Sequence, residues 1–198
     1  MEFRLLALLP PGGVERKISE LRESLTSIGG LAAAASLPPL VPLLFLPAQL
    51  PLPVGMSRPE GLGPPFRLDT AGYLREGGFL FLEVRSGGCY DRLRESLARR
   101  RPCPEGTSAC PPASRAPELY GTSCPQPFPL LEGFLLARME GPVLQGNPDC
   151  PQLPPPPPAC SFPAKRLWLV EADTLDPAAP WWEALEWEAR PLLRLKRA

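Results

Sequence analysis

Short apolar runs broken by proline and glycine dominate the first third of the chain. Residues 3–9 (FRLLALL) form an apolar run that ends at a Pro-Pro-Gly-Gly turn, and this pattern predicts a central β-strand. Residues 14–28 then repeat apolar side chains at helical spacing with charges on the opposite face, which predicts an amphipathic helix that ends at a Gly-Gly pair. Residues 41–46 (VPLLFL) predict a second strand, in which Pro42 cannot donate to a ladder and so requires an edge position or a bulge.

The middle of the chain repeats this arrangement. Residues 66–73 and 79–84 flank another Gly-Gly pair and predict a β-hairpin. Residues 90–101 carry apolar side chains on one helical face and arginines elsewhere, which predicts a second helix with a basic end. Such an end is typical of a solvated helix C-terminus, where the macrodipole favours cations, and a phosphate-binding patch is the alternative.

The remaining apolar segments predict strands that close the fold, at 133–139, 166–171 and 181–187. Two proline-rich segments, at about 102–127 and 142–163, predict loops or local disorder. The order of elements predicts an α+β protein of two similar lobes, in which each lobe packs a helix on an antiparallel sheet. We therefore expect residues 1–198 to form a single bilobal domain with two proline-rich loops.

Composition limits the chemistry that this chain can perform. None of its 198 residues is histidine, so no step that needs an imidazole can occur. Lys plus Arg and Asp plus Glu both total 21, so the net charge is zero and provides no general attraction to nucleic acid or to a membrane surface. The six cysteines include no C-x-x-C pair, and a zinc site would need four thiolates from scattered loops. The sequence therefore predicts no metal site and no cofactor.

Two features bear on the location of the protein. The first ten residues lack the basic region and the cleavage site of a secretory signal, and free thiols in a reducing cytoplasm are what we expect. Residues 31–54 are strongly apolar and long enough to span a bilayer, but six prolines interrupt them. Because that density of proline would leave backbone groups unsatisfied in lipid, we expect a buried strand with a proline-rich loop, and no membrane association.

Four segments together follow the pattern of a known superfamily. They are FRLLALLPPGGVERKISELRESL at the start, VPLLFLP near position 45, GGFLFLEVRSGGCYDRLRESLARR in the middle and RLWLVEADTLDPAAPWWEALEWEA at the end. Their order resembles that of the 2H phosphoesterases, the superfamily of the bacterial RNA 2′,3′-cyclic phosphodiesterases, which are also called 2′-5′ RNA ligases. The resemblance covers most of the chain and implies a two-lobed fold, although none of the four segments is a catalytic motif.

Active members of that superfamily carry two His-x-Thr motifs, one in each lobe, on strands that face a shared cleft. One histidine acts as base and the other as acid, while the threonines hold the phosphate. In this sequence the first motif falls on Leu40 and Pro42, and the second falls on Gly133 and Leu135. All four catalytic positions are thus apolar or glycine, so the resemblance implies the fold and denies the usual mechanism.

Other side chains are poor replacements for the lost groups. Glu132 adjoins the second motif and Arg138 ends the same predicted strand, so an acid and a cation are expected near the cleft. One carboxylate without a partner cannot divide the acid and base roles, and we interpret these residues as a surface pair. The cysteines have no histidine to activate them as nucleophiles. The four tryptophans could stack on bases, but aromatic residues on closing strands are more often core.

We expect a non-catalytic or divergent protein of this fold that binds a ligand or a protein partner in an apolar interlobe cleft. The first alternative is a divergent RNA 2′,3′-cyclic phosphodiesterase or 2′-5′ RNA ligase, which would use Arg138 and take RNA or a nucleotide as ligand. The second alternative is a proline-rich interaction protein, whose loops would recruit partners through residues 142–163, with the five prolines inside that segment as a ligand for an aromatic-lined domain. A basic cleft with convergent polar groups would favour the enzyme of the first alternative. An apolar cleft would favour the binding protein.

Overall fold

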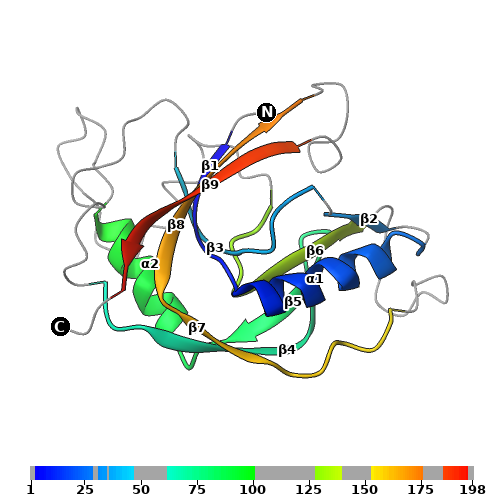
Figure 1. The fold of residues 1–198 in the computed structure, drawn as a ribbon, viewed down its shortest axis with the longest axis horizontal. Coiled ribbons are helices and arrows are strands. Elements are labelled where there is room, and N and C mark those ends of the chain that lie inside the picture. The colour runs from blue at the N-terminus through cyan, green and yellow to red at the C-terminus, as the bar shows by residue number, and fades with distance from the viewer. Residues whose placement is uncertain are drawn as a thin grey trace.

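The computed structural model describes residues 3–28, 31–34, 36–46, 62–100, 128–139, 153–175 and 185–195. The helices and strands in this part of the chain follow one another as Figure 1 shows. In chain order they are β1 (Phe3–Leu8), α1 (Gly12–Leu25), β2 (Leu31–Ala33), β3 (Val41–Leu46), β4 (Phe66–Glu76), β5 (Phe79–Arg85), α2 (Cys89–Arg99), β6 (Gly133–Met139), β7 (Ser161–Ala164), β8 (Arg166–Thr174) and β9 (Leu185–Arg194).

The strands form two antiparallel sheets. Sheet A has the order β3-β1-β8-β9, and sheet B has the order β2-β6-β5-β4-β7. Sheet A therefore joins two strands from the start of the chain to two strands from its end. Two antiparallel sheets with one helix packed on each confirm the predicted α+β class.

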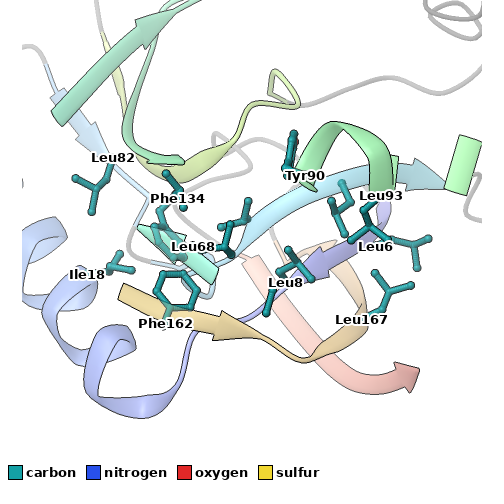
Figure 2. Packing of buried hydrophobic residues seen from close by; sticks show 14 of the residues in the cluster. Leu6, Leu8, Ile18, Leu68, Leu82, Tyr90, Leu93, Phe134, Phe162 and Leu167 are labelled. Carbon is teal, nitrogen blue, oxygen red and sulfur yellow. The ribbon is translucent and has the colours of Figure 1, made fainter. Parts of the chain in front are cut away.

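Each helix packs on the sheet that does not contain the strand preceding it. Helix α1 follows β1 of sheet A but contacts β6 and β2 of sheet B, while α2 follows β5 of sheet B but contacts β3 of sheet A. Figure 2 shows Ile18 of α1 beside Phe134 and Phe162 of sheet B, and it shows Tyr90 and Leu93 of α2 close to sheet A. The two lobes are thus tied together by an exchange of helices, which the sequence pattern did not predict.

Several predicted elements are confirmed, because proline and glycine mark their ends clearly. Strands β1, β3 and β6 begin and end within one residue of the predicted bounds, and α1 and α2 lie within three residues of theirs. Gly77 and Gly78 connect β4 to β5 with positive φ angles, as a tight hairpin turn requires. Pro42 lies on an edge strand, and the register of β3 against β1 shifts beside it.

The second half of the chain differs from its prediction at two places. The closing strand predicted at 181–187 is confirmed over 185–187, which belong to β9, and residues 181–184 lie outside the described residues. Strand β9 extends beyond the predicted end to Arg194, and Pro191 is tolerated because β9 is an edge strand. The loop predicted at 142–163 includes residues 161–163 of β7, which pairs with β4. The other proline-rich segment, 102–127, lies outside the described residues.

The apolar segment 31–54 contributes β2 and β3 to the two sheets, and its residues 47–54 lie outside the described residues. Strand β2 was not predicted, since three residues are too few to show a period. Neither helix in the described part of the chain is long and apolar enough to cross a membrane.

Buried side chains form two apolar clusters. The larger one, which we call the helix-side cluster, joins both helices to the sheet faces that they cover, and Figure 2 shows part of it. The smaller one, which we call the cleft cluster, joins the opposite faces of the two sheets. Its members are Phe3, Leu5, Ala7, Ala34, Leu37, Leu40, Phe45, Phe81, Phe128, Leu135, Val170, Ala172 and Leu185.

Candidate functional site

The two degenerate motifs meet in the cleft cluster. Leu40 immediately precedes β3 and is 0% exposed, while Leu135 lies in β6 and is 1% exposed. Both belong to the cleft cluster although they come from different sheets. Pro42 and Gly133 are also buried. The motif positions are therefore packed against apolar side chains, where a phosphodiester would have to give up its hydration without gaining a polar partner.

Three phenylalanines fill the cleft face of sheet A beside these positions. Phe128 lies just ahead of β6 and is 2% exposed. Its ring centroid lies 5.2 Å from that of Phe45 and 6.3 Å from that of Phe3, and all three rings meet edge to face. Because Phe128 belongs to the segment that leads into sheet B, it connects the two sheets. The sequence gives no signal for Phe128, since a single aromatic residue after a proline-rich segment shows no period.

The first motif is fixed by a tyrosine of α2. The hydroxyl of Tyr90 donates a 2.6 Å hydrogen bond to the backbone carbonyl of Pro42. Burial raises the pKa of the Tyr90 hydroxyl, so Tyr90 stays protonated as a donor at neutral pH. The guanidinium of Arg94 lies 5.6 Å from the centroid of the Tyr90 ring, in a cation–π arrangement. The Tyr90 hydroxyl thus fixes the backbone at Pro42, while the Pro42 side chain is apolar.

The second motif is fixed by an arginine of α1. Arg22 is 2% exposed. Its Nε and Nη2 donate to the carbonyl oxygen of Leu135 over 3.0 and 2.6 Å, and its Nη1 donates to the carbonyl oxygen of Leu37. Burial lowers the pKa of Arg22 to about 9, so the guanidinium remains charged at neutral pH. Arg22 forms no ion pair with a described residue, and backbone carbonyls alone stabilise its charge.

Arg22 was not predicted as a site residue, although the sequence carries a signal for it. It lies four residues after Ile18 and three before Leu25, which puts it on the apolar stripe of the predicted helix. A charged side chain on a buried stripe needs specific partners. Those partners lie 15 and 113 residues away along the chain, and no local pattern identifies them.

Gly133 has no space for a side chain. A Cβ atom at this position would lie 2.8 Å from the carbonyl oxygen of Leu82 and 3.4 Å from Cβ of Phe81. Opposite Gly133 in the ladder is Glu83, whose carboxylate accepts hydrogen bonds of 3.0 and 3.2 Å from Arg85. Burial raises the pKa of the nearby Glu132 carboxyl, and the Glu83 carboxylate, which is held by Arg85, lies near enough to add to that rise.

The interpretation of Glu132 and Arg138 as a surface pair stays a prediction, and the two residues lie in different surroundings. The carboxyl of Glu132 lies near α2, where burial raises its pKa, hydrogen bonds from Ser86 oppose that change, and Asp91 adds to it. Arg138 is exposed and lies farther along β6, opposite Phe79 and Ala32. An acid and a cation are therefore present, but they lie apart from each other.

Two tryptophans extend the cleft face across sheet A. Trp168 lies opposite Ala7, which in turn lies opposite Pro42, so the three side chains share one face of the sheet. Trp187 lies opposite Ala172 on the same face and is 40% exposed. The prediction that these tryptophans are core was wrong for Trp187, while Trp181 and Trp182 lie outside the described residues.

Within the described ranges, no group of three or more cysteine, aspartate and glutamate side chains is arranged to hold a metal ion. Cys89 and Cys160 are free thiols in this part of the chain.

Comparison with known proteins identifies the fold. No protein-family model and no curated protein matches the sequence. Among solved structures, TT0787 of Thermus thermophilus matches with a TM-score of 0.61 at 21% identity, over 96% of this chain and 97% of that chain. E. coli LigT complexed with 3′-AMP matches with a TM-score of 0.59 at 16% identity, over 98% and 96% of the two chains.

A third structure, named as a phosphoesterase, matches with a TM-score of 0.52 at 15% identity, over 98% of this chain and 97% of that chain. The chain therefore has a 2H phosphoesterase-like fold, as the resemblance in its sequence implied. Identities this low establish the fold alone, so the function depends on the residues at the site.

Proposed function

We propose that this chain is a non-catalytic protein with a 2H phosphoesterase-like fold, which binds an apolar or aromatic ligand or partner through its cleft face. The observation that carries the proposal is the burial of Leu40 and Leu135, the two motif positions that meet in the cleft cluster. Neither side chain can transfer a proton or hold a phosphoryl oxygen. General acid and base groups each contribute about 10² to 10⁴-fold, so their joint loss removes most of the acceleration that such a site provides.

The exposed part of the cleft face supports binding. Trp187 and Ala189 lie on the cleft face of β9, the edge strand of sheet A, opposite two members of the cleft cluster in β8. Trp168 lies half-buried on β8. Exposed aromatic side chains next to an apolar cluster are typical of recognition surfaces, because they supply large contact area at a small entropic cost. LigT in its solved complex holds 3′-AMP, whose base would stack on such a surface but whose phosphate would find no side chain at the motif positions here.

The enzymatic alternative is tested with an RNA substrate that ends in a 2′,3′-cyclic phosphate. We expect the wild type and the Arg138→Ala variant to show no turnover above a denatured control at several pH values. Robust turnover that depends on Arg138 would instead establish the divergent phosphodiesterase.

Binding is tested with a fluorescent apolar probe, anilinonaphthalene sulfonate. We expect the wild type to enhance its fluorescence and Trp187→Ala to reduce the enhancement several-fold. The matched control is Glu188→Ala, since Glu188 is the next residue of β9 and points to the opposite face. No enhancement by the wild type, or an equal loss in both variants, would contradict binding at the cleft face.

A further inference from the structure

The five prolines at 154–158 form an ordered strip on the surface of the protein. Residues 153–160 have no helix or strand assignment, and they lead directly into β7. In Figure 1 this stretch, coloured yellow to orange, runs as an extended trace past α1 toward β7. Proline fixes φ near the polyproline II value, so five prolines in a row favour that conformation, with three residues in each turn.

Exposure along the strip follows this period of three. Pro154, Pro157 and Cys160 are half-buried, whereas the pairs between them, which include Pro155, Pro156 and Pro158, are exposed. A polyproline II helix that lies with one face on the protein gives this pattern, because every third residue returns to the same face. The face with Pro155 and Pro158 is exposed and also borders α1, and the face with Pro156 and Ala159 is exposed as well.

Helix α1 provides the surface under the strip. Lys17, Glu20, Leu21 and Ser24 of α1 line a shallow groove together with four of the prolines. Leu153 packs against the helix-side cluster at one end, and the pairing of β7 with β4 holds the other end. The strip is thus held at both ends and lies beside α1 between them, so a partner that recognises this conformation has less chain entropy to remove on binding.

The charge of the strip narrows the kind of partner. Residues 151–164 include no charged side chain. Recognition of this segment must therefore rely on the proline rings and the backbone carbonyls, which is how aromatic-lined grooves bind polyproline II helices. The exposed prolines at 155 and 158 are spaced as P-x-x-P, and this spacing places both rings on one face, which is exposed and also lines the groove beside α1.

We propose that residues 154–158 are a docking strip for a partner domain whose aromatic-lined groove binds uncharged polyproline. This role is independent of the cleft face. The strip lies on α1, outside the cleft cluster, so the protein can present it whether or not the cleft is occupied.

The test uses the full chain and, as probe, a purified WW domain of the type that binds uncharged polyproline. Binding is followed by isothermal titration calorimetry, with a synthetic peptide of residues 151–162 as reference. We expect the full chain to bind at least as tightly as the peptide. The double variant Pro155→Ala with Pro158→Ala should lose about tenfold or more in affinity.

The matched control is the double variant Pro64→Ala with Pro65→Ala, which removes two exposed prolines outside the strip. It should bind like the wild type, and both variants should keep the melting temperature of the wild type. Weaker binding by the full chain than by the peptide would show that α1 covers the recognition face and would overturn the proposal. Absence of binding by both, or equal losses in the two variants, would overturn it as well.

Discussion

The hydroxyl of Tyr90 in α2 donates a hydrogen bond to the backbone carbonyl of Pro42 in β3, an edge strand of sheet A. This bond connects sheet A to a helix that directly follows β5 of sheet B. The two residues lie 48 positions apart in the chain, and the bond is buried. It satisfies a backbone acceptor beside the bulge in β3. The first motif is consequently held from the α2 side of sheet A, on the face opposite the cleft cluster.

Removal of this hydroxyl should destabilise the protein. Tyr90→Phe leaves the Pro42 carbonyl buried without its donor, which costs about 1–3 kcal/mol in the free energy of unfolding, measured by urea denaturation. The control is Tyr73→Phe. The Tyr73 hydroxyl is buried and has no hydrogen-bond partner within the described residues, so its removal should leave the stability unchanged or raise it. Equal losses in the two variants would contradict the role of the Tyr90 bond.

Arg22 should resist replacement even by lysine. Arg22→Met removes three donors and leaves the carbonyls of Leu135 and Leu37 without them, at a cost of about 1–3 kcal/mol for each buried acceptor. Arg22→Lys keeps the charge but lacks the planar fork that reaches both carbonyls, so it should also be destabilised. Urea denaturation measures both variants. A lysine variant as stable as the wild type would show that charge alone matters at this position.

Gly133 should tolerate no side chain. Gly133→Ala is expected to cost about 1–3 kcal/mol, because the added Cβ meets the carbonyl oxygen of Leu82. Gly72→Ala is the matched control, since a Cβ at Gly72 in β4 meets nothing within 4 Å. The control should be neutral or slightly stabilising. Thermal melting compares the two, and a stable Gly133→Ala variant would contradict the close approach.

The same contact bears on restoring the catalytic motifs. A variant that combines Leu40→His, Pro42→Thr, Gly133→His and Leu135→Thr would need the backbone of β6 to move away from β5. We expect this variant to be poorly folded and inactive toward a cyclic phosphate, as judged by circular dichroism and by turnover. Activity in a well-folded variant would show that the cleft geometry of an active site has been kept.

Stability should depend on pH through Glu132. Burial raises the pKa of Glu132 in the folded protein, so the folded chain holds this proton more tightly than the unfolded chain does. The stabilisation from the protonated Glu132 carboxyl is fully present below the pKa of the unfolded chain, about 4.3. It is lost as the pH rises through the pKa of Glu132 in the folded protein. Glu132→Gln should therefore raise the melting temperature at neutral pH, and the gain should vanish below about pH 4. A gain that is equal at every pH would point to packing in place of ionisation.

The sequence was informative where structure is local. Strands β1, β3 and β6 and both helices follow from periodicity and from the prolines and glycines that flank them. The resemblance placed the motif positions in β6 and at the start of β3, with Leu40 immediately before that strand, because the residues around them keep the apolar pattern of those strands. Strand β7 was missed, since SFPA is short and contains a proline that only an edge strand accepts.

The contacts that close the site are long-range, and the sequence could not predict them. Arg22 reaches Leu135 across 113 residues, and Phe128 meets Phe3 and Phe45 from a third segment. A pattern along the chain shows which face of a helix is buried, but not which sheet will cover it. The packing of α1 on sheet B therefore had to come from the structure.

The exchange of helices between the sheets means that neither half of the chain is an autonomous folding unit. A cut between β3 and β4 would leave the first fragment with β1 and β3 but without β8 and β9, which complete sheet A. The second fragment would carry most of sheet B but would lack α1, the helix that covers it. Each fragment would expose the apolar surface that the other buries, so the two pieces would be obligate complements, folded when mixed and unfolded when separate.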